Sequence, residues 1–137
     1  GGRQSAKYYF SDPEITLKSA PERNVNFPGS DLQFNLSSDD LLALQKASAI
    51  YSLPDLTFFS EEGSDTIKLI LRDKENDTSN TYDITIQGTA TGTFSLDLKI
   101  ENIRVLPGDY TVKVSKHLIS EWTNTDVDLT YYIALEP

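Results

Sequence analysis

Residues 31–51 constrain the fold most strongly, because a strand, a helix cap and an amphipathic helix are predicted there in direct succession. At the start of this stretch, Leu32, Phe34 and Leu36 alternate with polar residues, which is typical of a half-buried strand. Two serines and two aspartates follow, and these residue types favour a helix start because they satisfy free backbone N–H groups and suit the positive end of the helix dipole. The helix should turn one face toward a core, formed by Leu41, Leu44, Ala47, Ser48 and Tyr51.

The same order of elements is predicted a second time in the rest of the chain. After the helix, alternating apolar residues predict strands over residues 55–60, 66–72 and 81–87, and glycines interrupt the pattern at 88–92. The second unit is predicted as a strand, a short helix before Pro107-Gly108 and three strands: residues 93–100, 101–106, 110–115, 117–123 and 129–135. The chain is therefore predicted to be an α+β protein of two strand–helix–three-strand units, mostly antiparallel, with the helices on one face.

Composition is that of one soluble domain rather than a membrane or secreted protein. The 137 residues suffice for one core, and no apolar run approaches the roughly 18 residues of a membrane span. The absence of cysteine excludes disulfides and thiolate chemistry and is compatible with a cytosolic setting. Because the chain begins Gly-Gly rather than Met, we interpret its start as a cloning remnant and the chain as part of a longer protein.

No catalytic, metal or cofactor site is predicted. His117 is the one histidine, and no cysteine or neighbouring acid completes a metal set or a catalytic triad around it. Asp73, Glu75 and Asp77 alternate as in a calcium loop, but the glycine and the final glutamate of such a loop are missing, so a solvated acidic loop is expected. We therefore expect no enzyme activity, no metal and no cofactor.

Several segments resemble the C-terminal half of the DNA polymerase sliding clamp of T-even-type bacteriophages, in the same order and spacing over residues 6–137. KYYFSDPEIT and the later Asn26-Phe27-Pro28 resemble the last strand of that clamp's first domain and its interdomain connector. DDLLALQKAS resembles the first helix of its second domain. Pro-Gly-Asp-Tyr at 107–110 and YYIALE at 131–136 resemble the end of that domain, and the terminus is also similar to that of proliferating cell nuclear antigen.

The resemblance implies a domain division and a function. Residues 1–30 would hold the remnant, the last strand of a missing first domain and the connector, and residues 31–137 the clamp's C-terminal domain. In this family, three subunits close head to tail around duplex DNA, with helices inside and sheets outside, and the ring tethers the polymerase. The net charge of −9 argues against a generic DNA binder. Topological enclosure resolves this conflict, because an encircled DNA needs few phosphate contacts.

The resemblance also implies three functional surfaces. Lys46 and Arg104 would face the DNA from the two helices, although Ala49 stands where the family can carry a second inward base. Peptides of the polymerase and the clamp loader would bind an apolar groove formed by Phe27, Pro28, Ile133, Ala134 and Leu135. The edge toward the neighbouring subunit would be formed by Tyr82, Asp83, Ile84, Thr85 and Ile86. With the first domain missing, this edge should stay open or pair with residues 6–10 of another copy.

Simpler interpretations stay open for each surface and for the whole chain. Lys46 and Arg104 are equally well explained as solvated helix cations, and Ile133 and Leu135 as core residues. A non-enzymatic β-rich phage structural or carbohydrate-binding module is the alternative function, because Trp122 and the seven tyrosines are able to stack on sugars. The two functions differ in the helices they require, because only a clamp needs both on one sheet face. No membrane partner is expected, and a phage-encoded clamp would act in the host cytoplasm.

Overall fold

The order of elements in the computed structural model follows the predicted order. The model describes residues 27–76 and 80–137, so the strand predicted at 6–10 and most of the predicted connector lie outside the described residues. The described elements are β1 (Leu32–Leu36), α2 (Ser38–Tyr51), β2 (Asp55–Ser60), β3 (Thr66–Arg72), β4 (Tyr82–Ala90), β5 (Phe94–Lys99), the 3-10 helix η3 (Ile100–Asn102), β6 (Tyr110–Ser115), β7 (Ile119–Asn124) and β8 (Thr130–Ala134).

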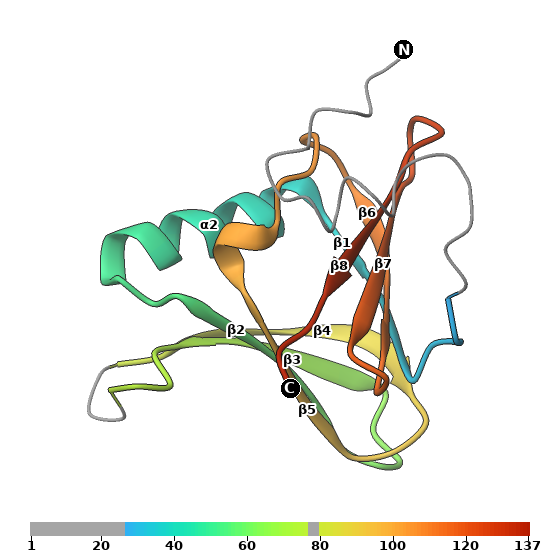
Figure 1. Ribbon diagram of the computed structural model, residues 1–137, viewed down its shortest axis with the longest axis horizontal. Coiled ribbons are helices and arrows are strands. Elements are labelled where there is room, and N and C mark those ends of the chain that lie inside the picture. The colour runs from blue at the N-terminus through green and yellow to red at the C-terminus, as the bar shows by residue number, and fades with distance from the viewer. Residues whose placement is uncertain (1–26, 77–79) are drawn as a thin grey trace.

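The strands form one antiparallel sheet in the order β5-β2-β3-β4-β1-β6-β7-β8. Figure 1 shows this sheet bent into two halves, β5-β2-β3-β4 and β1-β6-β7-β8, with α2 on the inner side of the bend. The predicted α+β class and the mostly antiparallel sheet are therefore confirmed.

Helix α2 begins and ends at residues whose chemistry fixes its limits. The Ser37 hydroxyl accepts a hydrogen bond from the Asp40 amide at 3.1 Å, and the Asp109 carboxylate accepts one from the Ser38 amide at 2.7 Å. Both contacts satisfy amides that a helix start leaves free. At the other end, Ser52 adopts a left-handed conformation with φ 56°. Tyr51 was predicted on the core face, but it lies 57% exposed because the helix runs past the core at this end (Figure 1).

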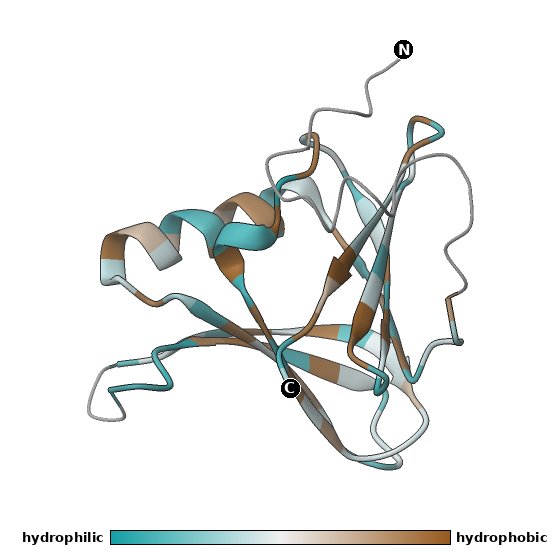
Figure 2. Ribbon diagram, in the orientation of Figure 1, coloured by the Kyte–Doolittle hydropathy of each residue, from teal (hydrophilic) through white to brown (hydrophobic). Residues whose placement is uncertain are grey.

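The core lies between α2 and the two halves of the sheet. Leu41, Leu44 and Ala47 of α2 are buried, as predicted, and they face the buried side chains of the strands. Phe34 of β1 and Phe58 of β2 meet with ring centroids 5.7 Å apart, so aromatic packing joins the two halves. Figure 2 shows apolar and polar residues alternating along the strands, and this alternation is the pattern from which the strands were predicted.

The prediction of a second helix is wrong in both the type and the length of the helix. Residues 101–106 do not form an α-helix. The chain makes only the 3-10 turn η3, which ends at Asn102, and the amide of the following Ile103 donates to the Ile100 carbonyl. Pro107 and Gly108 leave too few residues to offset the cost of nucleating an α-helix. The 3-10 turn still buries Ile100 and Ile103, three residues apart, so the apolar spacing that predicted a helix is used for packing.

Strand β4 continues past Gly88, where it was predicted to end, and ends at Ala90 before the second glycine, Gly92. Its first part, from Tyr82 to Gln87, pairs with β3, whereas Gly88, Thr89 and Ala90 pair with Phe34, Gln33 and Leu32 of β1. Gly88 is therefore the residue at which β4 crosses from one half of the sheet to the other.

Candidate functional site

The two predicted DNA-facing cations lie on neighbouring segments. Lys46 is exposed on α2, and Arg104 is exposed just after η3. The Gln45 side-chain amide donates to the Ile103 carbonyl at 3.4 Å, which connects α2 to this segment, and Figure 1 shows η3 beside α2. Neither cation forms an ion pair with another described residue, so both are available to an external anion.

The segments that carry these two cations also carry acidic and exposed apolar side chains. Carboxylates on α2, on η3 and in the loop before β6 outnumber them: Asp39, Asp40, Glu101 and Asp109. Leu42 on α2 is 45% exposed and Leu106 after η3 is 50% exposed. The helical side is therefore no basic phosphate-binding patch of the kind that carries ordinary DNA affinity.

The predicted subunit edge is part of β4. This strand is an inner strand of the sheet order rather than an outer one, yet within the described ranges residues 82–87 pair with β3 on one side and with no strand on the other. Tyr82, Ile84 and Ile86 are partly buried against the core, while Asp83 and Thr85 are exposed. These residues present an open edge of free backbone groups.

A polar groove continues this open edge. Its volume is about 390 Å³, and it lies where β1 and β4 separate, between residues that include Gln33, Asn35, Asp65 and Gln87. Because the groove begins where the ladder between β1 and β4 ends, an extended segment added along β4 would lead into it.

The predicted peptide-binding residues do not share one surface. Ile133 and Leu135 are 1% and 6% exposed and belong to the core, whereas Ala134 is partly exposed on the other face of β8. Phe27 packs on Tyr132, with ring centroids 6.4 Å apart, and Pro28 is exposed.

Tyr132 was not among the predicted peptide-binding residues, although its side chain reaches the surface of β8. Strand alternation was the available signal, because it places residues 132 and 134 on one face and residues 131, 133 and 135 on the other. The Tyr132 hydroxyl donates to the Glu121 carboxylate at 3.0 Å. Burial and then this carboxylate raise the pKa of Tyr132 to about 12, so its phenol is neutral and fixed in place at neutral pH.

The described part of the chain contains neither a metal-binding group of side chains nor a helix able to span a membrane. Between residues 27–76 and 80–137, no group of three or more His, Cys, Asp or Glu side chains is placed to hold a metal ion. His117 lies exposed in the turn between β6 and β7. No helix within the same ranges is long and apolar enough to cross a membrane.

These features define a class of protein: an antiparallel α+β domain with one α-helix on the inner side of a bent sheet, which is compatible with a DNA-clamp domain. A comparison with known proteins is more specific. The chain is 31% identical, over an aligned length of 139 residues, to the sliding clamp of Vibrio phage KVP40. The alignment covers 98% of this chain and 61% of that protein, so the chain spans about three fifths of its relative. No family model matches the chain. The similarity confirms the resemblance to phage sliding clamps.

Proposed function

We propose that the chain is the C-terminal domain of a phage-type sliding clamp, a non-enzymatic processivity factor that encircles duplex DNA and tethers the replicative polymerase. The similarity to the KVP40 sliding clamp over 98% of the chain is the observation that carries this proposal. Ring formation and polymerase binding belong to the longer protein, because the chain spans 61% of that relative. The alternative, a β-rich structural or carbohydrate-binding module, is not favoured by this similarity.

In this proposal residues 31–137 form the clamp domain, and residues 1–30 hold the end of a preceding domain and the connector. The domain is built from two units, β1-α2-β2-β3-β4 and β5-η3-β6-β7-β8. The sheet order supports this division, because each half of the sheet contains the first strand of the other unit: β5 lies beside β2, and β1 lies beside β6. An exchange of equivalent strands is what an internal duplication produces.

The partners follow from the same proposal. Three copies of the longer protein form the ring, a clamp loader opens it, and the assembly acts in the cytoplasm of the host cell. The polymerase and the loader contact the outer face of β8 through Phe27, Pro28, Tyr132 and Ala134, which are partly or fully exposed. Lys46 and Arg104 face the DNA.

Charge reversal on the helical side should reduce processive synthesis. In the longer protein, Lys46→Glu with Arg104→Glu removes two positive and adds two negative charges per subunit on a side that already carries more acids than bases. We therefore expect several-fold shorter extension products on a primed circular template. The matched control is Lys68→Glu with Lys116→Glu, because both are exposed cations away from the two helical segments, on β3 and in the turn after β6, and neither forms an ion pair with a described residue. Equal losses in the control would contradict the DNA-facing role. A protein with native residues that lengthens no products would contradict the clamp function.

Blocking the open edge of β4 should prevent subunit association. Thr85→Pro removes a backbone donor in the middle of this edge. The Gly88 amide bonds to the Asp65 carbonyl, and strand alternation then turns the amides of residues 83, 85 and 87 toward the open side. Proline at a sheet edge also opposes the addition of a strand. We expect the molar mass of the longer protein, measured by size exclusion with light scattering, to fall from that of a trimer to that of a monomer. The thermal melt of the variant serves as the control for folding. An unchanged mass in a folded variant would exclude this edge from the interface.

A further inference from the structure

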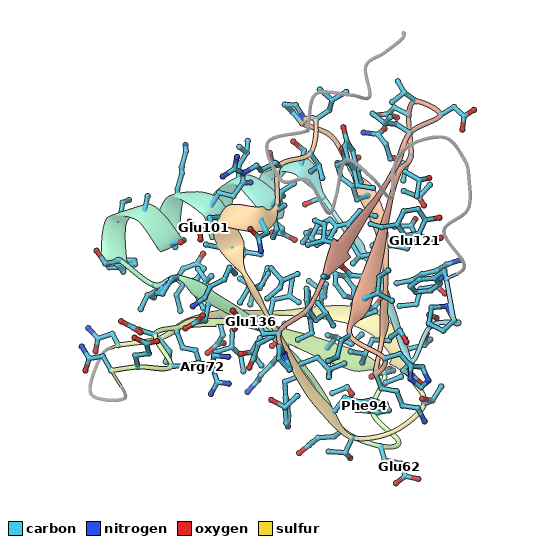
Figure 3. All side chains as sticks on the ribbon, viewed as in Figure 1. Glu62, Arg72, Phe94, Glu101, Glu121 and Glu136 are labelled. Carbon is cyan, nitrogen blue, oxygen red and sulfur yellow. The ribbon has the colours of Figure 1, made fainter. Side chains whose placement is uncertain are left out.

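Charged side chains from distant parts of the chain meet where the C-terminus approaches β2, β3 and β5. The cluster contains three carboxylates and three cations, which are Asp55, Asp97, Glu136, Arg72, Lys74 and Lys99. Figure 3 shows the labelled Arg72 and Glu136 on this side of the molecule. The charges balance, so each member depends on the others for compensation.

The cluster has a buried anchor. Asp55 is 0% exposed, and its carboxylate accepts hydrogen bonds from the Lys99 ammonium at 2.7 Å and from the Lys74 amide at 2.8 Å. Burial alone would raise the pKa of Asp55, but these contacts outweigh it and lower the pKa, so this carboxylate stays charged. Asp97 bonds to Arg72 and to the Thr57 hydroxyl. This part of the cluster is fixed by the sheet itself.

Like Lys74, Glu136 is a member of the cluster that lies outside the strands. It lies beyond the end of β8, and its amide donates to the Asp97 carbonyl of β5 at 2.8 Å. Its carboxylate meets the Lys74 ammonium at 2.8 Å and the Lys99 ammonium at 3.9 Å. Strands β5 and β8 are the two ends of the sheet order and share no paired register among the described residues. Glu136 therefore joins the two terminal strands.

We propose that Glu136 is an electrostatic clasp that holds the C-terminal segment against β5 and opens as ionic strength rises. The ion pairs of Glu136 are more exposed than the Asp55 anchor, with side chains 28% exposed for Glu136, 32% for Lys74 and 33% for Lys99, against 1% for Asp55. Salt screens partly exposed pairs far more than buried ones. The clasp is thus the salt-sensitive contact of an otherwise rigid region.

The contact between Glu136 and Lys74 supports the distinction between the salt-sensitive clasp and the buried Asp55 anchor. The hydrogen bond to Glu136 is the main influence that raises the pKa of Lys74, so the closed clasp binds the lysine in its charged form. Opening it leaves the remaining cluster with one surplus positive charge at the surface. If the proposed function is correct, the clasp also controls how freely β8 meets a partner peptide, because Tyr132 and Ala134 belong to the strand that the clasp restrains.

Hydrogen exchange of this chain tests the clasp directly. We expect amide exchange of a peptide covering residues 130–137, which contains the Glu136 amide bonded to the Asp97 carbonyl, to be several-fold faster at about 500 mM salt than at about 20 mM salt. Glu136→Gln should exchange fast at both concentrations, and Lys74→Gln should behave in the same way. The matched control is Glu62→Gln, because Glu62 is exposed at the far hairpin and its side chain has no ion pair with a described residue.

Two results would overturn the clasp. One is a Glu136→Gln protein whose exchange matches that of the native chain at both salt concentrations. The other is an equal acceleration in Glu62→Gln, which would indicate a general effect of charge. The proposed function fails separately: a clasp that responds to salt as expected, in a longer protein that does not stimulate synthesis, leaves the clasp standing and removes the clamp role.

Discussion

Replacement of Gly88 by alanine should lower the free energy of unfolding by about 2–3 kcal/mol, the upper part of the range for overpacking a close contact. A Cβ at this position would lie 2.6 Å from the Gln33 carbonyl oxygen, 2.7 Å from the Ile67 Cδ1 and 3.0 Å from the Phe34 Cβ. The first contact is with backbone, which cannot rotate away, so β1 and β4 must separate to accept the methyl group.

The position of Gly88 gives this substitution a second consequence. Gly88 is where β4 leaves β3 and joins β1, and the residues before it keep one edge open. A disturbed crossing should therefore change the pairing of β4 with β1, and with it the accessibility of the edge that we assign to the subunit contact.

The measurement is urea unfolding of the two proteins, with the midpoint and slope compared. Gly92→Ala is the matched control, because the nearest atoms to a Cβ there belong to the Phe94 ring at 3.6 Å, an ordinary contact distance. We expect that control to change stability little. Equal midpoints for Gly88→Ala and the native chain would contradict the close-approach argument.

Sequence patterns predicted the strands and the long helix well because their physics is local. The alternation of Leu32, Phe34 and Leu36 required one buried face, and the strand has the expected burial. The hydroxyl of Ser37 marked the helix start, where it caps the Asp40 amide. Capping and alternation each act within a few residues, so the sequence contains the information needed to predict them.

The failures concern features that depend on distant residues. The continuation of β4 past Gly88 is set by the backbone of β1, more than fifty residues away in sequence. The segment predicted as a second helix is short, and its geometry is decided by packing of Ile100 and Ile103 rather than by helix propensity. Among the candidate site residues, Lys46 and Arg104 are exposed as expected, whereas Ile133 and Leu135 lie in the core. The resemblance pointed to β8 but did not say which of its faces is exposed.

Strongly alkaline conditions should destabilise the chain, and Tyr110 should account for a large part of the loss. Its side chain is 0% exposed, and its hydroxyl donates to the Leu106 carbonyl at 2.6 Å. Burial raises the pKa of Tyr110 from 10.0 to about 12, because the phenolate cannot be solvated in the core. An unfolded chain ionises this phenol near pH 10, so the stabilisation is complete below that pH and is lost as the pH rises toward 12.

This rise in the pKa of Tyr110 corresponds to roughly 3 kcal/mol of stability lost across this window. Lys74 and Lys99 act in the same direction, because their pKa values are raised by hydrogen bonds to Glu136 and Asp55 and their charge is lost above about pH 10.5. Tyr110→Phe removes only the contribution of this phenol. We expect the alkaline loss of stability in the variant to be smaller by roughly 3 kcal/mol, at a cost of about 1 kcal/mol at neutral pH for the missing hydrogen bond.

Denaturant unfolding between about pH 8 and about pH 12, with phenolate absorbance recorded in parallel, measures both the alkaline loss of stability and the cost at neutral pH. Tyr51→Phe is the control, because Tyr51 is 57% exposed and folding changes the surroundings of its hydroxyl little. If Tyr110→Phe loses as much stability at high pH as the native chain, the buried phenol is not responsible. The remaining alkaline groups would then be Tyr132, whose pKa is also raised to about 12, and the lysines that bind Asp55 and Glu136. Tyr132→Phe and Glu136→Gln would distinguish these two contributions to the pH dependence.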